Sequence, residues 1–297
     1  MIARRNLQPF EFVQRVPDAG FEWLRGRGVR VGMTAAEIEA TKSEWFLREK
    51  RLPPFRGKIY RPLLAHTGLF RIFAETAPTR PGILAFANAF GALGLPIGEE
   101  ITLVITKPHS SQPLRLDYES LNKWKSEMLL MHALVTLWDA IRAEDVTTLA
   151  KFIRWKDGAV FYHGPTSMGD HRVQVIASSA LNPDTLRGLR PGDVIQPGRF
   201  ALRQIVNELL TKHRTTPQLV RDQGSGEQLC HVPESLNAAL WLQFALAQAS
   251  EYEFKRCIVC GVWFQIGRAA DARRADAAYC SNRCRQKRYR DSKETTK

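Results

Sequence analysis

Four of the five cysteines in this chain stand in two close pairs near the C-terminus. Two residues separate Cys257 from Cys260, three separate Cys280 from Cys284, and nineteen lie between the pairs. A C-x2-C turn brings two sulfurs to one ion, and Gly261 behind it supplies the backbone freedom that such a turn often needs. This spacing is typical of four-cysteine zinc sites. The sequence therefore predicts one structural zinc ion per chain, with Cys257, Cys260, Cys280 and Cys284 as its ligands.

Other uses of these cysteines fit the sequence less well. A catalytic C-x2-C redox pair is expected beside a βαβ pattern, which the sequence does not show, and would leave the second pair unexplained. Disulfides conflict with the reducing compartment inferred below, and ordinary buried thiols do not gather in two close pairs. Four cysteine ligands leave no open coordination position, so the metal is expected to fold its module and not to catalyse hydrolysis. The fifth cysteine, Cys230, is predicted to be a core thiol.

Positive charge is concentrated in the same C-terminal segment. The chain has a net charge of +13, and residues 255–297 contain twelve lysines and arginines against four acidic residues. Such a concentration favours a polyanionic partner, nucleic acid first, while a solvated basic end is the other interpretation. The candidate nucleic-acid contacts are Arg273, Arg274, Arg283, Arg285, Lys287, Arg288 and Arg290.

The second cysteine pair is predicted to sit at the start of a helix. Ser281 can cap a helix that begins at Asn282, which places Cys280 just before the helix and Cys284 in its first turns. A C-x2-C hairpin followed by a helix that delivers the second pair is the arrangement of a treble-clef or zinc-ribbon-like finger. We therefore expect a small finger of this kind at the C-terminus.

The chain before the first pair is predicted to form a hairpin and then a helix. The hairpin is expected over residues 217–232, around a Gly-Ser-Gly turn, and the helix over 233–254 is apolar on most sides. This helix is expected to run directly into the first cysteine pair. Trp263 and Phe264, just after that pair, are predicted to form the small apolar core beneath the metal.

The rest of the sequence predicts a mixed domain in which helices predominate. The strongest helix spans 117–145 and has an apolar core stripe with a spacing of three and four residues. The stripe consists of Leu121, Trp124, Met128, Met131, Val135 and Trp138. Short helical patterns are predicted in residues 1–60, two short helices within 68–94, and helices over 146–155 and 199–213; strands are predicted over 99–106, 159–164 and 172–178. The fold class is therefore α+β and predominantly helical, with a large N-terminal domain over 1–252, a sub-boundary near 180–198, and the finger over 253–297.

No membrane span or export signal is predicted from the sequence. The first residues carry charge without an apolar run behind it. The least polar stretch, 82–98, is interrupted by Asn88 and Pro96, so it is predicted to be a buried helix and turn. We expect a cytoplasmic protein with no membrane partner, and with it a reducing environment.

The densest set of acid-base side chains outside the cysteine region consists of His163, Asp170 and His171. No nucleophile motif, phosphate-binding glycine loop or H-E-x-x-H motif accompanies them. A polar loop between two strands explains the set more simply, so the chain is not expected to be an enzyme.

The order of the predicted elements resembles that of the CGNR-type zinc finger proteins of bacteria, in which the finger follows a domain called ABATE. The similarity covers roughly residues 200–290. It rests on the four cysteines, on Phe264 after the first pair, and on Tyr279 and Ser281 around the third cysteine. That family has Gly-Asn after the last cysteine where this chain has Arg-Gln, so a YCSxxCR-type four-cysteine zinc finger is the broader description.

This resemblance implies transcription regulation by a finger that binds DNA, with the four cysteines as zinc ligands. The alternative function is a zinc-stabilised adaptor whose finger binds another protein and whose basic helix is solvated. The sequence leaves the oligomeric state open.

Overall fold

The computed structural model describes most of the chain. The described residues are 12–30, 34–40, 42–50, 57–94, 101–104, 119–166, 171–222, 226–250, 253–267 and 273–294. Helices and strands are mixed, and helix is the larger share, as the sequence predicts. The boundaries near 180–198 and at 252 stay predictions.

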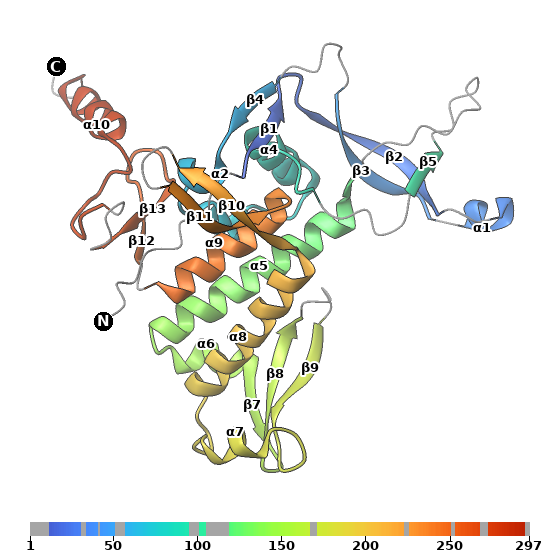
Figure 1. Ribbon diagram of the computed structural model, residues 1–297, viewed down its shortest axis with the longest axis vertical. Coiled ribbons are helices and arrows are strands. Elements are labelled where there is room, and N and C mark those ends of the chain that lie inside the picture. Colours follow the sequence, from blue (N-terminus) through green and yellow to red (C-terminus); the bar gives the residue numbers. More distant parts are fainter. Residues whose placement is uncertain are drawn as a thin grey trace.

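Five helices form the centre of the molecule (Figure 1). They are α3 (Leu69–Glu75), α5 (Leu121–Arg142), α6 (Val146–Phe152), α8 (Ile195–Lys212) and α9 (Leu236–Ala249). Helix α5 contacts α3, α6 and α8, while α9 packs against α3 and α8. The predicted stripe on α5 faces this core, where Trp124, Met128 and Met131 are fully buried. The role of that stripe as core is confirmed.

Local signals fix where several helices begin. Helix α4 (Arg80–Phe90) starts at Thr79, whose side chain accepts a hydrogen bond from the backbone N–H of Gly82, and it ends at Gly91 with φ +99°. Asp145 caps α6 in the same way, by accepting a hydrogen bond from the backbone N–H of Thr148. Helix α4 is short and part of its surface is buried, and no helix among the described residues is long and apolar enough to span a membrane. Two further helices are α2 (Pro62–Ala65) and α7 (Pro183–Arg187).

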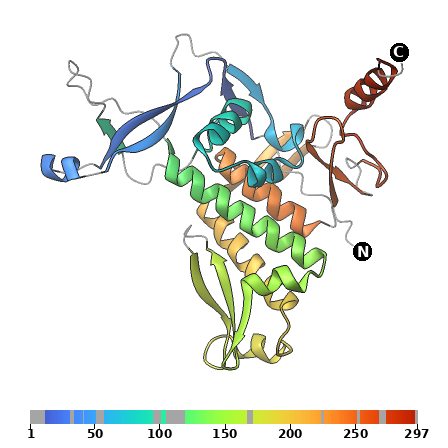
Figure 2. The ribbon, with the colours of Figure 1, turned by 180° about the vertical axis from the view of Figure 1, so that it is seen from behind.

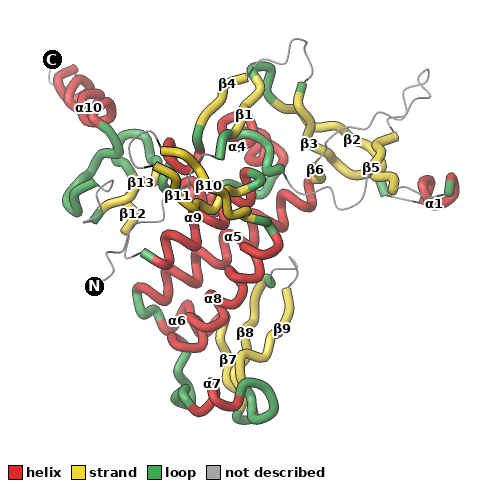
Figure 3. Tube along the Cα trace, in the orientation of Figure 1, coloured by secondary structure: helices red, strands yellow, loops and turns green. Residues whose placement is uncertain are grey.

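Strands lie around the helical centre (Figure 3). An antiparallel sheet in the order β7-β8-β9 lies against α8. A separate hairpin, β10–β11, contacts α9 through β11. The hairpin and the strands β8 and β9 are predicted from the sequence and confirmed, whereas the helix predicted over 146–155 ends at Phe152 and its last residues belong to β7. The strands of the sheet and the hairpin are β7 (Ile153–Lys156), β8 (Ala159–Pro165), β9 (His171–Ala177), β10 (Thr215–Asp222) and β11 (Gly226–Pro233).

The prediction of short helical patterns in residues 1–60 is mostly wrong. Among the described residues of this range, the elements other than α1 (Ala35–Ala40) are strands: β1 (Gln14–Pro17), β2 (Phe21–Arg30), β3 (Glu44–Glu49) and β4 (Gly57–Tyr60). The neighbours Phe46 and Leu47 are both buried, so β3 lacks the alternation that marks a half-buried strand. Strands β2 and β3 extend away from the helices in a sheet of order β5-β2-β3-β6 (Figure 2). This sheet includes β5 (Ile101–Val104), a predicted strand, and β6 (Glu119–Ser120).

Helix α9 does not run into the first cysteine pair, which corrects a second prediction. It ends at Ala249, Ser250 is extended, and strand β12 (Glu253–Arg256) follows. The extended segment lets Phe254 turn towards the helical core, where its ring centroid lies 5.4 Å from that of Phe70. The last elements are β13 (Trp263–Ile266) and α10 (Asn282–Glu294).

Two adjacent leucines on α5 test the assigned helix face. Leu130 is 1% exposed and Leu129 is 52% exposed. We expect Leu130→Ala to lower the free energy of unfolding by about 2–5 kcal/mol, because it leaves a cavity in the core. Leu129→Ala should change it by less than about 0.5 kcal/mol. Urea unfolding followed by circular dichroism measures both, and equal losses would contradict the described packing.

Candidate metal centre and basic helix

The first cysteine pair lies on the turn of the β12–β13 hairpin. Arg256 pairs with Trp263 at the end of the ladder, and the backbone N–H of Cys257 donates to the carbonyl of Val262 at 2.9 Å. Gly261 has φ +70°, a left-handed conformation in which other residues are strained, and its N–H donates to the carbonyl of Cys257 at 2.8 Å. The predicted role of Gly261 in this turn is confirmed.

The second pair is positioned by the start of α10. The side-chain oxygen of Ser281 accepts a hydrogen bond from the backbone N–H of Cys284 at 3.3 Å, which is the predicted cap. Cys280 precedes the helix and Cys284 lies in its first turn. Ser281 therefore fixes the start of α10 between the two cysteines of the second pair.

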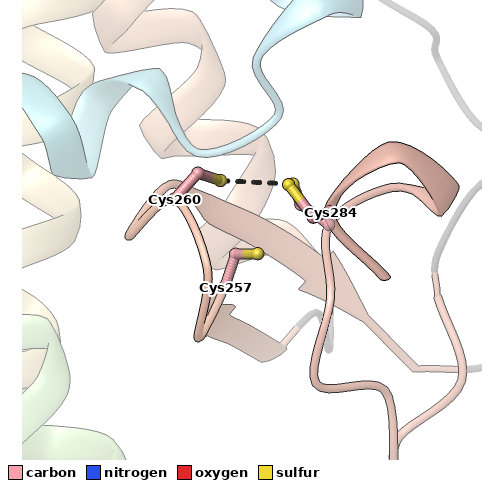
Figure 4. A group of neighbouring side chains, drawn as sticks. Cys257, Cys260 and Cys284 are labelled. Carbon is pink, nitrogen blue, oxygen red and sulfur yellow. Dashed lines mark hydrogen bonds between the residues drawn. The ribbon is translucent and has the colours of Figure 1, made fainter. Parts of the chain in front are cut away.

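The structure brings the four sulfurs of Cys257, Cys260, Cys280 and Cys284 together. Figure 4 labels Cys257, Cys260 and Cys284 of this cluster. All four lie within 4.8 Å of one another, with 3.5 Å between the sulfurs of Cys260 and Cys280 and 3.6 Å between those of Cys280 and Cys284. A tetrahedral zinc ion with Zn–S bonds of about 2.3 Å separates its sulfurs by about 3.8 Å. The cluster is therefore compatible with a structural metal ion.

The electrostatics of the cluster also favour a cation. Burial alone would raise the pKa of Cys257, but N–H groups of Cys280, Cys260 and Val259 donate to its sulfur, and its pKa falls to about 6. Burial, together with the neighbouring sulfurs, raises the pKa of Cys280. The protein groups thus stabilise one thiolate and oppose a second one. A divalent ion supplies the positive charge that allows all four cysteines to be thiolates.

Beneath the sulfurs lies a very small apolar core. Its buried members are Cys257, Phe264 and Ile266, with Ala277 and Tyr279 packed against them. Phe264 therefore has its predicted place.

Trp263 does not share this core, which corrects the prediction made for it. Strand geometry sends neighbouring side chains to opposite faces, so Trp263 and Phe264 cannot both lie under the metal.

Trp263 instead helps to enclose an arginine of the helical centre. The guanidinium carbon of Arg71, on α3, lies 4.8 Å from the ring centroid of Trp263, 5.0 Å from that of Trp138 and 5.5 Å from that of Phe254. Asp139 on α5 accepts two hydrogen bonds from Arg71, at 2.7 and 2.8 Å. We call these five residues the arginine cage. It joins the hairpin that carries the first cysteine pair to α3 and α5.

Two further contacts join the hairpin to α3. Glu75 accepts a hydrogen bond from the indole N–H of Trp263 at 2.9 Å and forms an ion pair with Arg256 at 2.6 Å. Gly68 lies so close to Trp263 that an added Cβ would be 2.6 Å from the Cβ of that residue. None of these contacts was predicted from the sequence. A lone arginine within the apolar run of α3 was the one available signal, and it does not reveal a partner almost two hundred residues away.

The predicted nucleic-acid contacts fall into two groups. Five lie on α10 and are exposed: Arg283, Arg285, Lys287, Arg288 and Arg290. The other two lie on the segment between β13 and α10. The backbone of Arg273 is bonded to Gln265 and Gly267, whereas the side chain of Arg274 forms an exposed ion pair with Asp276 at 3.3 Å.

Other candidate groups do not form a comparable site. His163 lies opposite Val173 and His171 lies opposite Pro165, so the two histidines are not cross-strand partners. Asp170 lies outside the described residues. Cys230 is buried on β11, as predicted for a core thiol, and burial raises its pKa. Within the described part of the chain, the four cysteines are the one group of His, Cys, Asp and Glu side chains close enough to hold an ion.

The contact of Gly68 with Trp263 gives a test of how the hairpin is attached. Gly68 has φ −114°, which alanine can adopt, so Gly68→Ala acts through the clash with Trp263. We expect amide hydrogen exchange in residues 253–267 to become about tenfold faster, because overpacking costs about 1–3 kcal/mol. Gly188→Ala is the matched control, since its nearest neighbour would be 3.5 Å away. Unchanged exchange in Gly68→Ala would contradict the described packing of the hairpin.

Comparisons of the chain with protein-family models, with curated proteins and with solved structures gave no match, so function is inferred from this site alone.

Proposed function

We propose that this chain is a zinc-finger protein that binds DNA through its C-terminal module and regulates transcription. One observation carries the proposal: the element that supplies the last of four clustered sulfurs is also a helix with exposed cations. A metal ion in the cluster fixes the start of α10 and thereby the direction in which its cations point. A module of this kind is suited to hold a basic helix against a polyanion.

We assign zinc and a treble-clef-like or zinc-ribbon-like fold to the finger. The C-x2-C turn of the β12–β13 hairpin supplies one pair of ligands, and the start of α10 supplies the other. Thiolates are soft ligands, and a set of four in tetrahedral reach suits zinc. With four protein ligands the ion has no open position for water or substrate, so its role is structural. The resemblance to the CGNR-type fingers agrees with this assignment and with DNA as the partner.

The charge of α10 supports DNA as the partner. Between Arg283 and Glu294 the helix has six lysines and arginines and two acidic residues. Cations that neutralise phosphates release condensed counterions, and this release makes nucleic-acid binding favourable and dependent on salt. All six of these cations are exposed, so they are accessible to a large polyanion.

Metal content tests the site directly. We expect about one zinc ion per chain in protein purified under reducing conditions, and close to none in Cys257→Ser and Cys280→Ser, because each variant removes one of four ligands. Elemental analysis by mass spectrometry measures this ratio. Cys230→Ala is the control, because it removes a buried thiol outside the cluster. Full metal content in both serine variants would refute the ligand assignment.

The salt dependence of DNA binding tests the function. The doubly substituted Lys287→Ala, Arg288→Ala protein should bind random duplex DNA more weakly. The slope of log affinity against log salt should fall by about two in magnitude, about one for each phosphate that the variant no longer neutralises. Fluorescence anisotropy over a salt series gives the slope.

The matched control for this test is Arg199→Ala with Arg203→Ala, which removes the same charge from exposed positions on α8. The slope of this control protein should stay unchanged. Equal slopes in both double variants would show that net charge alone matters. No binding by the wild type at low salt would contradict DNA binding and leave the protein-protein adaptor as the alternative.

A further inference from the structure

One row of side chains on α10 is neutral apart from its last member. Asn282, Gln286, Tyr289 and Lys293 follow one another at intervals of four, three and four residues, which places them on one face of the helix. The ammonium nitrogen of Lys293 lies 4.7 Å from the ring centroid of Tyr289, as expected for neighbours in a row. All four side chains are exposed. We call them the polar row.

The polar row points away from the metal centre. Successive residues of an α-helix are turned by about 100°, so Gln286 is turned by about 200° from Cys284, which faces the other sulfurs. The row therefore lies on the side of α10 opposite its anchor. Helix α10 also projects away from the central helices in both ribbon views (Figures 1 and 2). A partner can reach the row without displacing another element of the described chain.

Cations border the polar row on both sides. Arg283, Lys287 and Arg290 recur at intervals of four and three residues and form one flank. Arg285 and Arg288 form the other, about 160° away around the helix axis. A binding surface that met phosphates on one side only would leave one of these flanks in solvent. Two cationic flanks match a partner that has one phosphate backbone on each side of the helix.

We infer that α10 lies in the major groove of duplex DNA, with Asn282 and Gln286 directed at base edges and the two cationic flanks at the phosphates of the two strands. This inference rests on the proposed function and specifies how the finger binds. The major groove is about 12 Å wide and admits an α-helix, and Asn and Gln side chains bond adenine through two hydrogen bonds. The 13 residues of α10 span about 20 Å, enough to follow the groove over several base pairs.

Other nucleic acids fit this helix less well. The major groove of an A-form RNA duplex is deep and narrow, so side chains cannot read it. A single strand has one backbone and is bound through aromatic stacking beside one positive groove, whereas α10 has a single tyrosine and two cationic flanks. Duplex DNA is therefore the partner that uses both flanks and the row between them.

Chemical protection tests the position of the helix without knowledge of a preferred site. Dimethyl sulfate methylates guanine N7, which faces the major groove. We expect the full-length, zinc-loaded protein to protect guanine N7 on duplexes selected from a randomised library. DNA that is bound but whose guanine N7 atoms are methylated as fast as in free DNA would overturn the inference, even though the proposed function would stand.

Removal of the two amides tests their role in base recognition. The double variant Asn282→Ala, Gln286→Ala has unchanged charge, so it should bind random duplex DNA with an affinity within about threefold of the wild type and with the same salt slope. On the selected sequences its affinity should fall about tenfold or more. Ser292→Ala is the matched control, because it is a neutral change on the same exposed helix but outside the polar row.

The outcomes separate this inference from the proposed function. Selection of the same sequences by the double variant and the wild type, or equal binding of duplex DNA, single-stranded DNA and duplex RNA by the wild type, would overturn major-groove recognition alone. Failure of the wild type to bind any nucleic acid at low salt would overturn the proposed function and the inference together. Zinc content equal to that of the wild type shows that the variant finger is folded.

Discussion

The C-terminal module depends on one constraint, which is that four sulfurs from two separate segments must lie around a single point. The apolar core beneath them is too small to fold a segment of about forty residues, because its buried members are Cys257, Phe264 and Ile266. Gly261 turns the hairpin towards this point, and Ser281 starts α10 beside it. The proposed DNA-binding role of α10 depends on the sulfur cluster, because Cys284 holds the first turn of the helix at the cluster and so determines which side of the helix faces outwards.

The β12–β13 hairpin is also attached to the helical centre, through a buried charge. Burial of a guanidinium group is costly unless the group is paired, and Arg71 is paired with Asp139 and surrounded by aromatic rings from both parts of the chain. Two rings of the cage, Phe254 and Trp263, belong to the hairpin that carries the first cysteine pair. The stability of the sulfur cluster and that of the helical centre are therefore linked through shared residues.

Local signals in the sequence predicted the cysteine cluster and the start of α10. The cysteine spacing identified the cluster, and a short-range signal identified the cap at Ser281, because a cap depends on residues a few positions apart. Contacts between distant segments could not be predicted in this way. The side chain of Trp263 was assigned to the finger core because its partner Arg71 lies far away in the sequence. Strand β3 was missed because both of its faces are buried at Phe46 and Leu47. The resemblance to a known family, and the binding of zinc and DNA, stay predictions from the residues.

The short connection between α9 and the finger has a mechanical consequence. Three residues separate Ala249 from Glu253, and even a fully extended chain between these two residues reaches only about 14 Å. The connection is short, and Phe254 and Trp263 hold the hairpin against the helical centre. The first cysteine pair is therefore placed close to α3 and α5. A partner bound to α10 would accordingly be held close to the helical centre of the same molecule.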